Sequence, residues 1–170
     1  KKYDKVIELD YNLSGLKKLF SDNQYPKPRL PANLKEKIEK QILSIYPNFL
    51  AKPFVCFLLR KKRSLEYYDN LRDCGPEKNY VKSIKEFVSR GFGVVSTGEV
   101  NDKDFEKIDG YYSFKNINLD YYLLNLYFIL NTKILICQHS GPIYLTNSIK
   151  TQNILINTFP FFNGTLSNID

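Results

Sequence analysis

The turn near residue 140 holds the residue types best suited to binding a phosphate group. An apolar run at 134–137 predicts a short buried strand, and residues 138–142 (QHSGP) predict a turn that leads into a helix. A helix start presents free backbone N–H groups to an anion, so Gly141 and the hydroxyl of Ser140 are candidate phosphate ligands. His139, the only histidine, either contacts the same ligand or is a packed or solvated side chain. A plain helix cap is the alternative interpretation of the Ser-Gly turn.

A second group of candidates follows the apolar run 54–59, which predicts a strand covered on both faces. Four basic residues, 60–63, leave this strand at the end where open parallel sheets bind ligands. Arg60 can place its guanidinium fork on a diphosphate, whereas the lysines at 61 and 62 are predicted to be solvated.

Several common catalytic patterns are absent from the sequence. It contains no GxGxxG after a strand, no GxxxxGK[ST] and no GxSxG, which argues against a dinucleotide fingerprint, a P-loop and a hydrolase elbow. The three cysteines lack CxxC spacing and there is one histidine, so a zinc site is not expected. We therefore expect no metal and no cofactor, and any catalysis would depend on cations that stabilise a leaving diphosphate.

The elements that must position these residues alternate between short apolar strands and amphipathic helices. This alternation predicts an α/β fold, a Rossmann-like parallel sheet with helices on both faces. We expect strands at 54–59, 92–95, 134–137 and 153–157, and a short strand or loop at 111–112. We expect helices from Pro76 to the residue before Gly91, at 102–107, at 119–130 with Asn118 as its cap, and from Pro142 to about Ser148.

The chain divides into two segments in this interpretation. Residues 1–52 form a linker plus one helix, for which Asn33 is the expected N-cap, and residues 53–170 form the Rossmann-like domain. The helix either lies against that domain or joins it to another one. The chain has no methionine, so we expect it to be part of a longer protein that has a further N-terminal domain.

Charge and cysteine content narrow the class of partner. The net charge is +7, and residues 1–100 carry 20 basic against 12 acidic side chains, whereas residues 101–170 carry 5 against 6. This excess indicates an anionic partner such as a phosphorylated ligand, an anionic membrane face or a nucleic acid. Three cysteines with no evident pairing favour a reducing, cytoplasmic environment.

The order of the predicted strands, helices and short motifs over residues 54–160 resembles the C-terminal, nucleotide-sugar-binding half of GT-B glycosyltransferases. More narrowly, it is similar to a bacterial group of surface-carbohydrate glycosyltransferases, in which an R-G-[FY]-x-V-[IV]-x-x-G strand recurs. Residues 90–98 (RGFGVVSTG) follow that pattern, and the Ser-Gly turn follows a later strand as in the group. The sequence departs from the group at Thr97, where a larger apolar residue is common, and at His139, a variable position.

The resemblance implies a role for each candidate. Arg60, Arg72 and the Ser140-Gly141 turn would hold the diphosphate of a nucleotide sugar, with His139 beside them. From the residues alone, Arg72 can simply pair with its neighbour Asp73. The acceptor would be a glycan or a lipid-linked sugar, and the base would come from the further N-terminal domain. We therefore expect a metal-independent, cytoplasmic enzyme of polysaccharide or glycoconjugate biosynthesis, which can associate peripherally with the inner face of the membrane.

Other functions are compatible with the same residues. The first is a non-catalytic basic α/β module that binds nucleic acid or serves in assembly. Because the basic residues are not interleaved with aromatic ones on one element, we expect no nucleic-acid partner. The second is a degenerate glycosyltransferase-like domain that folds but binds no donor. The third is another enzyme of phosphorylated ligands on the same fold, since a fold alone does not fix a function.

Overall fold

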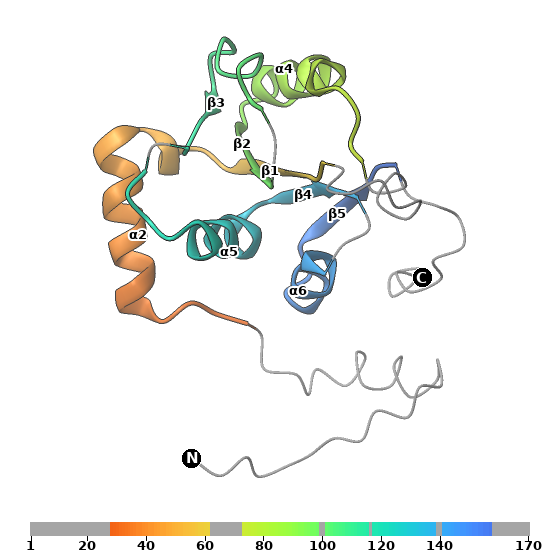
Figure 1. The fold of residues 1–170 in the computed structure, drawn as a ribbon. Helices are drawn as coiled ribbons and strands as arrows, with labels where there is room; N and C mark the ends of the chain where they lie inside the picture. The colour runs from red at the N-terminus through yellow and green to blue at the C-terminus, as the bar shows by residue number, and fades with distance from the viewer. Residues whose placement is uncertain (1–27, 62–72, 99–100, 116, 139–140, 158–170) are drawn as a thin grey trace, which may run out of the picture.

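The computed structural model describes residues 28–61, 73–98, 101–115, 117–138 and 141–157, and in them a single five-stranded sheet forms the centre (Figure 1). All neighbouring strands are parallel, in the order β3-β2-β1-β4-β5. The strands are β1 (Phe54–Leu59), β2 (Gly93–Gly98), β3 (Tyr111–Tyr112), β4 (Ile134–Cys137) and β5 (Gln152–Leu155). The helices are α2 (Ala32–Ile45), α4 (Val81–Ser89), α5 (Tyr121–Asn131) and α6 (Pro142–Ser148), with short 3-10 turns η1 (Phe49–Ala51) and η2 (Glu77–Tyr80).

The apolar run that predicts the first strand forms the middle of the sheet. All six residues of β1 are buried, because β2 pairs with one side of it, β4 with the other, and helices cover both faces. Side chains alternate between the faces: Phe54, Cys56 and Leu58 belong to one apolar cluster, and Val55, Phe57 and Leu59 to the other. Burial of each large apolar side chain contributes about 1.5–3 kcal/mol relative to exposure.

Helices cover both faces of the sheet, which confirms the predicted fold class. On one face, α4 packs through Ile84 beside the segment that contains Phe105 and Ile108. On the other face lie α2, α5 and α6, as Figure 1 shows. Ile38 and Ile42 of α2 are fully buried there, so the helix of the N-terminal segment lies against the sheet domain and contributes to its core.

Strand order fixes where a ligand can bind. From β1 the chain proceeds outward through β2 to β3, and it then returns to place β4 on the other side of β1. The connections that leave β1 and β4 at their carboxyl ends therefore run to opposite sides of the sheet. This is a topological switch point, the place where open parallel sheets leave a crevice for ligands.

Three local predictions were wrong, and in the first two a different residue caps the helix. Helix α2 begins after Pro31, not Asn33, since the Pro31 carbonyl accepts hydrogen bonds from the N–H groups of Leu34 and Lys35 at 3.0 and 2.9 Å. The cap of α5 is Asp120, not Asn118: its carboxylate accepts from the Leu123 N–H at 2.8 Å.

The third wrong prediction is the helix at 102–107. Residues 101–110 instead form successive turns, in which the Asp102 carbonyl accepts from the N–H groups of Phe105 and Glu106. The side chains of Phe105 and Ile108 anchor these turns in the core. Within the described residues, every helix is too short or too polar to cross a membrane.

Candidate functional site

The switch point is built around the peptide of Arg60, the first residue beyond β1. Gln138, the first residue beyond β4, contacts it with both ends of its side-chain amide. The Arg60 N–H donates to Gln138 Oε1 at 3.3 Å, and Gln138 Nε2 donates to the Arg60 carbonyl at 3.5 Å. The same carbonyl accepts from the Cys74 N–H at 2.8 Å. Because Gln138 is only 1% exposed, water does not compete for these bonds.

The side chains of Arg60 and Lys61 have different surroundings. Among the described residues, Arg60 takes part in no ion pair and is half-buried at the carboxyl edge. Lys61, predicted to be solvated, instead pairs with Glu77 at 2.9 Å and donates to the Gly75 carbonyl at 2.7 Å. Burial lowers the pKa of Lys61, but the hydrogen bond with Glu77 and the nearby acidic groups together outweigh it, and the net shift is upward. Lys61 is therefore a structural cation, and Arg60 is the candidate ligand cation of the two.

At their carboxyl ends, β1 and β2 pack closely together at Gly98, the last residue of β2. Gly98 has φ +94°, and a Cβ added there would lie 2.2 Å from the carbonyl oxygen of Leu59. Its own carbonyl accepts from the hydroxyl of Tyr121 at 2.8 Å. Tyr121 is 48% exposed and its ring contacts that of Tyr122, so an exposed aromatic pair borders the edge. The pair directly follows the cap of α5, and it is not among the candidates that the sequence predicts.

The turn after β4 has the predicted form where the structure describes it. Gly141 is exposed, directly precedes Pro142 at the start of α6, and has open space where a Cβ would lie. A ligand oxygen can therefore approach the backbone of Gly141 without meeting a side chain of the described residues. Helix α6 has only seven residues, so its own dipole is a small part of any anion binding. Arg72, His139 and Ser140 lie outside the described residues.

A polar network around the Cys74 carbonyl lies beyond the carboxyl end of β1, next to η2. The Cys74 carbonyl accepts from the hydroxyl of Tyr80 at 2.6 Å and from Asn157 Nδ2 at 3.4 Å. Burial raises the pKa of Tyr80 to about 12 and also raises the pKa of the Cys74 thiol. Both groups are therefore protonated at neutral pH, and Cys74 is not an activated nucleophile.

A second polar network lies away from the edge, between β2 and β3. Asp102, 2% exposed, accepts hydrogen bonds from Tyr111 at 3.0 Å and Ser113 at 2.9 Å and pairs with Lys115. Ser96 of β2 hydrogen-bonds the Tyr111 hydroxyl at 2.5 Å. Burial alone raises the pKa of Asp102, but the hydrogen bonds from Lys115, Ser113 and Tyr111 outweigh it and lower that pKa. This network links β3 to β2 through hydrogen bonds, and no local sequence motif predicts it.

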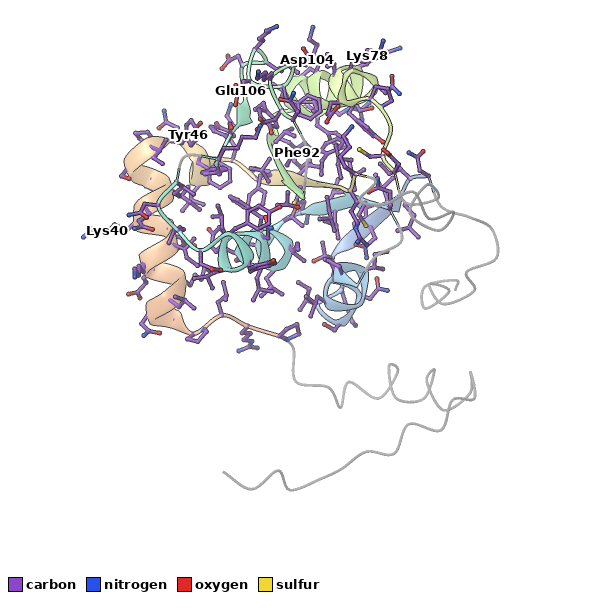
Figure 2. All side chains as sticks on the ribbon, viewed as in Figure 1. Lys40, Tyr46, Lys78, Phe92, Asp104 and Glu106 are labelled. Carbon is purple, nitrogen blue, oxygen red and sulfur yellow. The ribbon has the colours of Figure 1, made fainter. Side chains whose placement is uncertain are left out.

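Two hollows on the surface lie elsewhere. One, of about 560 Å³, is on the outer side of η2 and α4, where Lys78, Lys82 and Lys85 line it; Figure 2 shows Lys78 there, away from the sheet. The other, of about 290 Å³, is at the amino ends of β1 and β4 and includes Lys52 and Lys133 in its lining. Neither hollow includes the carboxyl edge. Strand topology and the position of Arg60, rather than concavity, mark the candidate site.

The described residues contain no group of three histidine, cysteine or acidic side chains arranged to hold a metal ion. No protein family, no curated protein and no solved structure matches the chain. The site's own residues, together with the resemblance in their order, therefore carry the functional proposal.

Proposed function

We propose that this chain binds a nucleoside diphosphate sugar at the carboxyl edge of β1 and β4, as the donor-binding half of a GT-B-type glycosyltransferase. The observation that carries the proposal is the switch point itself. It presents Arg60, a cation without an ion-pair partner among the described residues, and Gln138 and Cys74 hold the Arg60 backbone through hydrogen bonds to its N–H and its carbonyl. A guanidinium in that place can form two parallel hydrogen bonds to a diphosphate.

The proposed reaction separates charge at the donor. The bond between the sugar and the diphosphate breaks, and the diphosphate leaves with the electron pair while an acceptor hydroxyl attacks the sugar and gives its proton to a base. Arg60 stabilises the negative charge on the leaving group, and the open backbone at Gly141 offers room beside it. By the resemblance, Arg72, Ser140 and His139 would contact the same diphosphate. The catalytic base would come from the further N-terminal domain. The acceptor would be a glycan or lipid-linked sugar at the cytoplasmic face.

Calorimetric titration with UDP, GDP, CDP and ADP at two salt concentrations tests the proposal. One diphosphate should bind selectively, and Arg60→Ala should weaken it about tenfold or more, since a charge-assisted hydrogen bond contributes about 1.5–3 kcal/mol. Lys133→Ala is the matched control, because it removes the same charge from the opposite edge of the sheet. Equal loss of affinity in both variants, or no selective binding by the wild-type chain, would contradict the proposal.

One observation favours a second candidate, a basic module that binds a polyanion. Lys78, Lys82 and Lys85 follow one another along a single side of η2 and α4, and among the described residues none of them has an ion-pair partner. This candidate predicts binding that falls steeply with salt and shows no nucleotide preference. It also predicts loss of binding in a variant with all three lysines changed to glutamine and none in Arg60→Ala.

A further inference from the structure

Gln138 extends the contact between β1 and β4 at the carboxyl ends of the two strands. Backbone pairing of the two strands ends at Leu58 and Cys137. Beyond that pair, the amide of Gln138 continues the pattern as a backbone peptide would, accepting from the Arg60 N–H and donating to the Arg60 carbonyl. Burying a polar amide is costly unless it is hydrogen-bonded, and both hydrogen bonds that the structure shows for this amide go to the backbone of one residue, Arg60.

Buried threonines in the same core serve other groups. Thr132 donates to the carbonyls of Phe54 and Ile134 at the amino edge, and Thr146 bonds within α6 and to Asn153. Neither contacts the switch point. Gln138 differs because both hydrogen bonds that the structure shows for its amide go to the residue that carries the candidate ligand cation.

We propose that Gln138 is a positioning residue, which fixes the backbone of Arg60 so that the Arg60 guanidinium meets the diphosphate of the ligand. The inference rests on the proposed function. Its mechanism is that one side chain holds both peptide groups that flank the Cα of Arg60, through the N–H of one and the carbonyl of the other. Without Gln138, the Arg60 carbonyl keeps its bond from the Cys74 N–H, but the Arg60 N–H keeps no side-chain partner among the described residues. The peptide group between Leu59 and Arg60 can then rotate, and the side chain samples positions away from the ligand.

A double-mutant cycle separates positioning from general support of the fold. Affinities for inorganic pyrophosphate and for UDP, GDP, CDP and ADP are measured in the wild-type chain, Gln138→Met, Arg60→Met and the double variant. Gln138→Met should weaken binding about tenfold when Arg60 is present and have no further effect when Arg60 is absent, since residues that act as a unit are not additive. Thr132→Val controls for the loss of a buried hydrogen bond at the other edge.

A conservative variant supplies a readout that a purely structural role would not move. A protonated carboxyl group has one donor and one acceptor, as the amide does, whereas an ionised one only accepts. Gln138→Glu should therefore bind the diphosphate as the wild-type chain does while the introduced carboxyl group is protonated, and lose affinity as the pH rises. The wild-type chain, titrated over the same range, accounts for ionisation of the ligand itself.

The outcomes distinguish the inference from the function on which it rests. Unchanged affinity in Gln138→Met, or equal losses with and without Arg60, would overturn the positioning role while leaving the binding site in place. Wild-type protein that binds neither pyrophosphate nor any of the four nucleotides would overturn the proposed function and this inference with it.

Discussion

Asp102 is a carboxylate that the fold buries among hydrogen-bond donors, and its charge is part of the structure. Asp102→Asn should lower the free energy of unfolding at neutral pH by about 1.5–3 kcal/mol, because it removes a charged acceptor from two hydroxyl groups and a lysine. Denaturant unfolding measures this loss. Asp104→Asn is the control, since Asp104 is exposed and its contact with Lys107 is 4.0 Å long.

The same network predicts how stability depends on pH. The folded-state pKa of Asp102 is lower than its ordinary value, so its contribution is fully present above the unfolded pKa, about 3.9, and is lost as the pH falls through the folded value. Wild-type protein should therefore lose stability below about pH 4 more steeply than Asp102→Asn does. Parallel curves for the two proteins would show that the carboxylate is not held in this way.

Single residues also show what a sequence can and cannot reveal. Arg60 and Lys61 are adjacent cations at the end of a strand, and nothing local separates them. Their roles differ because Glu77, distant in sequence, lies beside Lys61 and not beside Arg60. Gln138 is part of the predicted turn, yet its role depends on a contact with a strand that is 78 residues away.

At the scale of elements, Gly98 sets how closely β2 can approach β1. Gly98→Ala should destabilise the protein by about 2 kcal/mol more than Gly91→Ala, because both have positive φ but only the Cβ at 98 meets the Leu59 carbonyl. Thermal unfolding of the two variants makes the comparison. Gly98→Ala should also weaken diphosphate binding, since Arg60 follows Leu59. Equal stability of the two variants would refute the close approach.

The bounds of two neighbouring strands, β1 and β4, were predictable because each is a short apolar run, whereas β2 and β5 include polar residues and their predicted bounds, 92–95 and 153–157, differ from Gly93–Gly98 and Gln152–Leu155. The run 54–59 and the run 134–137 match β1 and β4 residue for residue. Helix caps were less predictable, because several polar residues near one helix start compete for the same N–H groups. Asn118 and Asp120 both suit the start of α5, and only the fold selects Asp120.

At the scale of the whole molecule, the strand order decides where the candidate site lies, and it could not be inferred from local pattern. Alternating strands and helices predict a parallel sheet, but many strand orders satisfy that alternation. The return of β4 to the side of β1 brings residues 60 and 138 together. Likewise, only the tertiary structure shows that α2 packs on the sheet with α5 and α6 (Figure 1).

The most direct test is to map the bound nucleotide on the isotope-labelled chain by changes in backbone amide chemical shifts. On addition of UDP, GDP, CDP or ADP, the amides of Arg60, Gly98 and Gly141 should shift together and saturate at one dissociation constant. These three residues lie at the carboxyl edge, on or directly after strands or at the start of α6. Shifts confined to the lysine-lined side of α4 would contradict a nucleotide site at the switch point and favour the polyanion-binding module.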